Sequence, residues 1–204
     1  MAQNLILLDY GGVLGYDHLI ENEVLLGSKM NISPDELNER TSEKSKIGRA
    51  FRENQVTEVE FWRAVSMDES ITATVAKEFT KMWMDTYSLN KDMMRYIQGL
   101  RTQSMKVGVL TNIDVARSKL LEQILDVESN LDYYFPSYKY GYSKDNPNLW
   151  QFLRSELRDF DNVVYVDDRT EHIESAERVG WKAIKYSTLS DFMVQFEKLR
   201  VSLS

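Results

Sequence analysis

Short, uninterrupted apolar runs recur along the chain, and three of them end directly before a polar side chain. Those three runs span Asn4–Leu8, Lys106–Leu110 and Asn162–Val166. A fourth run covers Lys182–Tyr186, and a more weakly marked one lies around Tyr133–Lys139. Continuous runs rich in β-branched residues are typical of strands buried on both faces. The pattern therefore predicts a parallel sheet built from these runs.

Segments with apolar side chains at helical spacing separate the predicted strands. They span Lys91–Gln103, Val115–Leu125, Asn148–Leu157, Glu171–Val179 and Asp191–Arg200. Strands that alternate with helices of this length are typical of βαβ units, in which helices cover both faces of the sheet. The fold class that we expect is therefore α/β, with a doubly wound parallel sheet.

Between Tyr16 and Ser88 this alternation stops, and no convincing strand pattern is present. Ser33-Pro34-Asp35-Glu36 and Thr57-Glu58-Val59-Glu60 have the form of capping boxes, which mark helix starts. Thr74–Tyr87 carries aromatic and aliphatic residues at helical spacing. We therefore expect about four helices in this stretch.

These helices would form an all-helical cap of residues 16–88, inserted into a core of residues 1–15 and 89–204. Aromatic residues at helical spacing are expected to make the cap's own core: Phe51, Phe61, Trp62, Phe79 and Trp83. Arg49 and Arg52 flank Phe51. These arginines would either meet a second anionic or hydroxyl group of a substrate or lie on a solvated helix face.

Composition excludes several classes of protein. The 204 residues are 43% hydrophobic, too apolar for a disordered chain, and the formal net charge of −7 argues against coating nucleic acid or an anionic membrane. The absence of cysteine excludes disulfides and Cys-ligated zinc, and two histidines are too few for a multi-histidine metal site. Neither a signal peptide nor an apolar membrane span is apparent, so we expect a cytoplasmic protein.

Polar side chains end three of the predicted strands, at the edge where an open parallel sheet binds ligands. They are Asp9, Thr111 and the pair Asp167 and Asp168. Singly, such residues often only terminate a strand or cap the next helix. Together they would bring oxygen ligands from three strands to one edge, where closely held carboxylates favour a cation. Mg²⁺ accepts carboxylates, waters and phosphate oxygens, which predicts a metal-assisted site for a phosphorylated ligand.

Three further features suit a phosphate group. Gly11 and Gly12 follow Asp9, and a glycine turn exposes backbone N–H groups toward an anion, although a plain tight turn has the same sequence. Thr111 and Asn112 carry side chains that donate hydrogen bonds to phosphate oxygens. Lys144 lies in a polar loop, where it is either solvated or a point charge for phosphate and carboxylate.

In this order the segments resemble the four motifs of the haloacid dehalogenase superfamily. The matching segments are Leu8–Leu14, Val109–Asn112, Lys144 and Val164–Asp168. The resemblance covers nearly the whole chain and implies a Rossmann-like core with a small C1 cap. It is greatest to glucose-1-phosphatase-like members, within the subgroup of sugar-phosphate phosphatases and mutases.

The resemblance implies a role for each matching residue. Asp9 would be the nucleophile that attacks phosphorus and forms an aspartyl-phosphate, which water then hydrolyses. Thr111 and Asn112 would bind the transferring phosphoryl group, with Lys144 steadying it and Asp9. The implied Mg²⁺ would be held by Asp9, Asp168, the backbone carbonyl of Gly11, and Asp167 either directly or through water.

The sequence departs from the family pattern at two positions. Gly11 stands where related phosphatases have an acid/base Asp, and Asp145 stands where Pro usually follows the lysine. Loss of the acid would slow the reaction unless Asp17 or His18 substitutes, or unless the leaving group is a good one, such as a sugar anomeric phosphate. The change after the lysine is expected to alter only how the loop enters its helix.

The expected function is therefore a Mg²⁺-dependent phosphatase for small phosphorylated metabolites such as sugar phosphates. A non-catalytic phospholigand binder or regulatory protein is the alternative, and Gly11 is the feature in its favour. The acidic pair Asp167 and Asp168 argues against dehalogenation, which uses no metal. A phosphonatase would use a cap lysine as a Schiff base, for which Lys44 and Lys46 are candidates.

Overall fold

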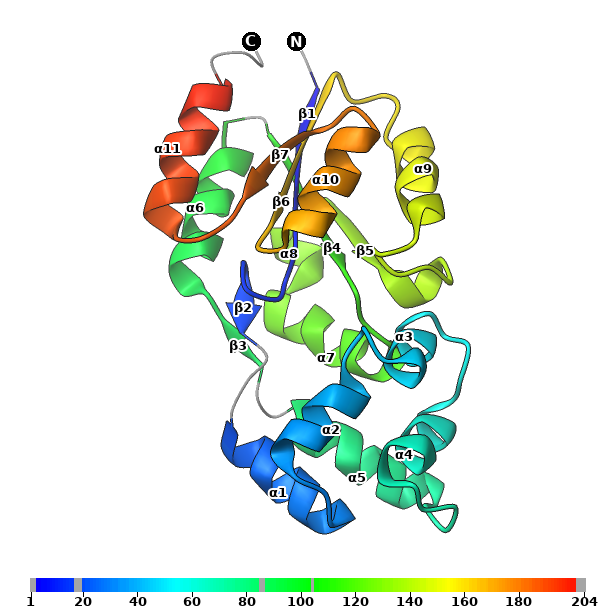
Figure 1. Cartoon of the computed structure of the whole chain (residues 1–204). Helices are drawn as coiled ribbons and strands as arrows, with labels where there is room; N and C mark the ends of the chain where they lie inside the picture. The colour runs from blue at the N-terminus through cyan, green and yellow to red at the C-terminus, as the bar shows by residue number, and fades with distance from the viewer. Residues whose placement is uncertain (1–2, 17–19, 85–86, 104, 201–204) are drawn as a thin grey trace.

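The computed structural model describes residues 3–16, 20–84, 87–103 and 105–200. Five parallel strands form the central sheet in the order β5-β4-β1-β6-β7 (Figure 1). The strands are β1 (Asn4–Leu8), β4 (Lys106–Thr111), β5 (Tyr133–Pro136), β6 (Asn162–Asp167) and β7 (Lys182–Lys185). Each contains the core of a predicted apolar run, which confirms the expected α/β class. The weakly marked run is shorter than expected, because the chain turns after Pro136 into the 3-10 helix η1 (Ser137–Lys139).

Helices cover both faces of this sheet (Figure 1). They are α6 (Lys91–Arg101), α7 (Val115–Leu125), α8 (Val127–Asn130), α9 (Pro147–Glu156), α10 (Thr170–Arg178) and α11 (Leu189–Arg200). Five of them lie within two or three residues of their predicted ends; the four-residue α8 was not predicted. Short loops join strand and helix, as a doubly wound fold requires.

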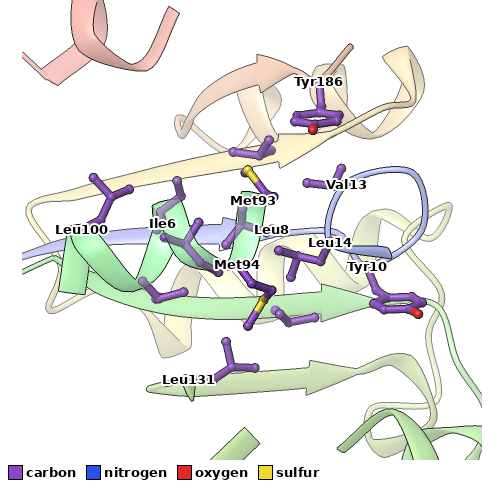
Figure 2. Packing of buried hydrophobic residues seen from close by; sticks show 14 of the residues in the cluster. Ile6, Leu8, Tyr10, Val13, Leu14, Met93, Met94, Leu100, Leu131 and Tyr186 are labelled. Carbon is purple, nitrogen blue, oxygen red and sulfur yellow. The ribbon is translucent and has the colours of Figure 1, made fainter. Parts of the chain in front are cut away.

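The central strand β1 divides the core into two layers. Ile6 and Leu8 contribute to the cluster under α6, α7 and α11, as the packing of α6 against β1 shows in Figure 2. Leu5 and Leu7 contribute to the second cluster, with residues of α9 and α10. All four β1 side chains are fully buried, which explains why the run is uninterrupted rather than alternating.

Strand register brings the polar strand ends to one edge. Leu8 pairs with Val109 on one side and with Val166 on the other, and the Asp9 N–H donates to the Val166 carbonyl at 2.8 Å. Asp9 and Asp167 therefore follow neighbouring, registered positions of β1 and β6. The strand register thus confirms the prediction that the polar residues at the strand ends lie together at the carboxyl edge of the sheet.

Between β1 and α6 the described part of the chain contains five helices, where about four were expected. They are α1 (Ile20–Met30), α2 (Pro34–Thr41), α3 (Lys46–Arg52), α4 (Glu58–Ser66) and α5 (Ala73–Met84), and together we call them the cap. The expectation of no strand in this stretch was wrong at its ends. Residues Gly15–Tyr16 (β2) pair antiparallel with Ser88–Leu89 (β3), and strands of two residues leave no periodic signal.

The cap has an aromatic core of its own, as predicted. Phe51 stacks on Phe61 with ring centroids 4.2 Å apart, and Trp62 donates its indole N–H to Thr80 at 2.8 Å. Thr57 and Glu60 form the reciprocal capping box. At Ser33 only one of the two capping-box hydrogen bonds forms: the Ser33 hydroxyl accepts from the Glu36 N–H, whereas the Glu36 carboxylate pairs with Arg40. Among the described helices, none combines the length and apolarity of a membrane span.

Candidate active site

A cavity of about 310 Å³ lies where the carboxyl edge of the sheet meets the cap. The predicted site residues that line it are Asp9, Gly11, Gly12, Thr111, Asn112, Lys144 and Asp168. Cap residues close its other side, among them Ser42, Glu43 and Arg52. The volume suits a small metabolite.

Lys144 is buried rather than solvated, with 2% of its side chain exposed. Its Nζ lies 2.8 Å from Oδ2 of Asp9 and 2.8 Å from Oδ2 of Asp167. Backbone bonds hold the residue in place, because its N–H donates to Asn112 Oδ1 and its carbonyl accepts from the Trp150 indole. The lysine is thus fixed between two carboxylates at the strand ends, and these outweigh burial and raise its pKa.

Asp167 is held almost entirely by protein donors. Besides Lys144, its Oδ2 accepts from the Tyr165 hydroxyl and lies 3.1 Å from His172 Nδ1, while its Oδ1 accepts from the Arg169 N–H at 2.9 Å. Burial alone would raise the pKa of Asp167, but Lys144 and His172 outweigh it and hold the pKa well below its usual range. The carboxylate is therefore ionised and anchored.

His172 is a site residue that sequence reasoning missed. Its ring is buried, and its Nε2 lies 3.2 Å from Oδ1 of Asp145. Burial lowers the pKa of His172, but the bonds to Asp145 and Asp167 outweigh it and raise the pKa, which favours an imidazolium that donates to both. Asp145, where the family usually has Pro, thus does more than alter the entry to a helix: its side chain reaches the acidic pair through His172.

Asp9, Asp167 and Asp168 form an acidic cluster, with ligand oxygens all within 4.8 Å of one another. Burial, with a further contribution from the Asp167 charge, raises the pKa of Asp9 to about 7 against the opposing effect of Lys144. The pKa of Asp168 is also raised, by burial and by Asp167. A cation would relieve this repulsion, so the donor set fits a hard divalent metal.

The glycine turn after β1 packs directly against the cluster. Gly12 has φ +71°, and a Cβ on it would overlap the Asp168 carboxylate. A Cβ on Gly11 would instead meet no atom within 4 Å. The turn therefore requires glycine at position 12, whereas position 11 has room for a side chain.

Glu43 is the second residue that sequence reasoning missed. Its Oε2 accepts from Asn112 Nδ2 at 2.7 Å, and its other oxygen pairs with Arg169. A glutamate in the middle of the cap carries no local signal for this contact, because only the folded position of the cap creates it. The residue links the cap to the predicted phosphate-binding amide and to the segment after Asp168.

The remaining candidate residues from the sequence differ in burial and in whether they line the cavity. Arg52 is buried and lines the cavity, while Arg49 is half-exposed, 3.9 Å from Asp145. Lys44 and Lys46 are exposed, and neither lines the cavity, which removes their support as Schiff-base lysines. Asp17 and His18, the suggested substitutes for the acid, lie outside the described residues.

Comparison with solved structures supports the fold. The HAD family enzyme bt-2542 of Bacteroides thetaiotaomicron, in complex with magnesium and inorganic phosphate, superposes with a TM-score of 0.72 at 19% identity, covering 91% of this chain and 94% of that one. An HAD-like family hydrolase from Porphyromonas gingivalis gives a TM-score of 0.70 at 15% identity, covering 98% of each chain.

A 2-haloacid dehalogenase from Pseudomonas syringae pv. Tomato DC3000 superposes with a TM-score of 0.63 at 16% identity, covering 90% of this chain and 86% of that one. At these identities the likeness establishes the fold and not the reaction. No curated protein sequence matches the chain. The sequence profile of haloacid dehalogenase-like hydrolases matches residues 4–180, which includes all four motifs. The chain therefore belongs to the haloacid dehalogenase-like hydrolase family.

Proposed function

We propose that the protein is a Mg²⁺-dependent phosphatase that hydrolyses small phosphomonoesters through an aspartyl-phosphate on Asp9. The observation that carries this proposal is the buried Lys144, placed between Asp9 and Asp167 next to the acidic cluster. A mere phosphate binder needs donors for an anion, but it does not need a buried carboxylate in the cavity that receives that anion. A nucleophile does.

Asp9, Asp168 and the Gly11 carbonyl are the proposed ligands of Mg²⁺. Asp167 is proposed to act through water, because protein donors already engage both of its oxygens. When bound, the ion would neutralise phosphate charge and favour the ionised form of Asp9. The complex of bt-2542 with magnesium and inorganic phosphate supports this assignment by analogy.

The protein's own groups would perform the transfer. A carboxylate oxygen of Asp9 forms a bond to phosphorus while the bond from phosphorus to the ester oxygen breaks. Lys144 keeps Asp9 oriented and ionised, and the Thr111 hydroxyl and the Asn112 amide donate to the phosphoryl oxygens. Water then attacks the phosphorus of the aspartyl-phosphate, which releases inorganic phosphate and regenerates Asp9.

The leaving oxygen must carry away negative charge or gain a proton. Gly11 supplies no acid, so a stable leaving group such as that of an anomeric sugar phosphate suits the site best. This agrees with the proposed likeness to glucose-1-phosphatase-like members with a C1 cap. Residues 16–88 are then the cap that excludes water and sets specificity over a core of residues 1–15 and 89–204.

The test is a phosphate-release screen of purified protein against sugar and nucleotide monophosphates, with Mg²⁺ and with EDTA. Asp9→Asn is the matched variant, because it keeps the size and two hydrogen-bonding positions of the side chain. Release that requires both the metal and Asp9 supports the phosphatase. Equal release by Asp9→Asn refutes the nucleophile. Tight phosphoester binding with no release favours the alternative, a non-catalytic binder, for which Gly11 is the motivating observation.

A further inference from the structure

The loop that carries Lys144 contacts the junction of β6 and α10 at two neighbouring residues. The first contact is the ion pair of Lys144 with Asp167, at the end of β6. The second is made by Asp145, whose Oδ1 lies 3.2 Å from Nε2 of His172 in the first turn of α10. The loop is therefore held at two points, and the second of them has no role in the proposed reaction so far.

The backbone of the loop fixes the point from which the Asp145 side chain extends. Lys144 and Asp145 are the central residues of a turn in which the Asn146 N–H donates to the Ser143 carbonyl at 2.9 Å. Asn146 is then the N-cap residue of α9. Aspartate has a short side chain, so a fixed backbone leaves its carboxylate few positions. The carboxylate of Asp145 is thus a defined partner for the His172 ring.

The His172 ring is buried and is held by a carboxylate at each of its two nitrogens. Its Nδ1 lies 3.1 Å from Oδ2 of Asp167, and its Nε2 faces Asp145 on the opposite edge. The hydrogen bond at one ring nitrogen fixes how the other nitrogen is presented to its own partner. Asp145 therefore orients the edge of the ring that His172 turns toward Asp167.

The Asp167 carboxylate passes this constraint on to Lys144. Its Oδ2 lies within hydrogen-bond distance of His172 Nδ1, the Tyr165 hydroxyl and Lys144 Nζ, so one oxygen is fixed by three groups. The Lys144 ammonium lies 2.8 Å from this oxygen and 2.8 Å from Oδ2 of Asp9. Because both carboxylates share one ammonium, a rotation of Asp167 would move Lys144 relative to Asp9. The contacts that begin at Asp145 therefore end at the proposed nucleophile.

We propose that Asp145 and His172 are a positioning pair that holds Lys144 in place against Asp9. The inference rests on the proposed function and adds two residues that act on phosphoryl transfer through Lys144 rather than on the substrate. A displacement of about 1 Å in a reacting group can cost about 10²-fold in rate, so the pair should contribute to kcat more than to KM. Proline, which usually follows the lysine in the family, would offer His172 no such acceptor.

The kinetic test uses p-nitrophenyl phosphate and variants of Asp145. Asp145→Ala should lower kcat by about 10–100-fold and leave KM within about threefold of wild type, because the phosphate-binding groups stay in place. Asp145→Asn keeps an oxygen acceptor for His172 and should recover most of the rate. Asp159→Ala, at a side chain that is 86% exposed, should match wild type. A kcat of Asp145→Ala close to that of wild type, or a loss carried mainly by KM, would overturn the proposal.

A double-mutant cycle tests whether Asp145 acts through His172. The amide of His172→Asn offers a donor close to the place of Nδ1, so this variant keeps a partner for Asp167 and loses the contact with Asp145. It should lower kcat about as much as Asp145→Ala, and the double variant should be no slower than either single variant. Effects that multiply would mean that Asp145 acts by another route, such as its contact with Arg49, and would overturn the pairing.

The ¹H–¹⁵N signal of the Lys144 ammonium separates this inference from the proposed function, because it needs no turnover. Lys144→Arg identifies the signal, which should shift in Asp145→Ala. It should stay near its wild-type position in Asp145→Asn, which removes the charge and keeps the acceptor. A shifted signal in a protein that releases no phosphate from any phosphoester would reject the phosphatase and keep the positioning pair. Wild-type turnover with an unmoved signal in Asp145→Ala would reject the positioning pair and keep the phosphatase.

Discussion

Nζ of Lys144 lies 2.8 Å from Oδ2 of Asp9, and both residues are buried at the carboxyl edge of the sheet. The same ammonium also meets Asp167. One cation therefore compensates two buried carboxylates, and its removal would leave both without their strongest partner.

Lys144→Met is accordingly expected to lower both stability and activity. The loss of unfolding free energy should be about 3–5 kcal/mol, because an uncompensated charge stays buried. Urea denaturation of wild type, Lys144→Met and the double variant Lys144→Met/Asp167→Asn measures it. The double variant should recover part of the lost unfolding free energy, because it removes the buried charge of Asp167 that Lys144 no longer compensates. A Lys144→Met protein as stable as wild type would contradict the role of this ion pair.

Gly11→Asp tests the missing acid. A Cβ at position 11 would meet no atom within 4 Å, so the backbone there can carry a side chain. A general acid is worth about 10²–10⁴-fold, chiefly for poor leaving groups. The ratio of alkyl-phosphate to aryl-phosphate hydrolysis should therefore rise by at least about tenfold. Gly12→Asp is the matched control and should lower both rates, because its side chain would displace Asp168. An unchanged ratio for Gly11→Asp would show that another group supplies the proton.

Mg²⁺ is expected to stabilise the protein against heat. Binding to the folded state alone adds about 2.7 kcal/mol at one hundred times Kd, and here it also relieves repulsion within the acidic cluster. Thermal melts with Mg²⁺ and with EDTA measure the shift for wild type and Asp168→Asn. The shift should largely disappear in Asp168→Asn and persist in Asp191→Asn, whose carboxylate bonds Ser187 and Thr188 away from the site. Equal shifts in all three proteins would place the ion elsewhere.

Asp132 is expected to make the free energy of unfolding depend on pH. Partial burial raises its pKa, but the Val107 N–H and the cations Lys106 and Arg101 outweigh it, so the folded pKa lies below the usual 3.8. The ionised Asp132 therefore stabilises the folded protein at pH values above 3.8, and this stabilisation is lost as the pH falls through the lower pKa of the folded state. Asp132→Asn should be less stable at neutral pH by about 1–2 kcal/mol.

Urea denaturation from pH 7 down to pH 3 measures this difference. The gap between wild type and Asp132→Asn should narrow as the solution becomes acidic. Asp159→Asn, whose side chain is 86% exposed, serves as the control and should stay close to wild type throughout. A gap that widens in acid would reverse the sign and contradict the assignment.

The sheet was predictable because a strand buried on both faces has a continuous apolar sequence, as Leu5 to Leu8 show. The closeness of the polar residues at the strand ends was predictable as well, because the register of β1 and β6 places Asp9 and Asp167 side by side. Glu43 and His172 were not predictable, because their role depends on which element packs against the site. The same holds for Arg52, whose burial is set by its place at the boundary between cap and core.

The central claim is that Asp9 becomes phosphorylated, and rapid-quench single turnover with a ³²P-labelled phosphoester tests it most directly. We predict acid-stable, hydroxylamine-labile label on the peptide that contains Asp9, which borohydride reduction converts to homoserine at position 9. The label should be absent from Asp9→Asn, which should also release no phosphate. Phosphate release from an unlabelled wild-type protein, or label on another residue, would contradict the account.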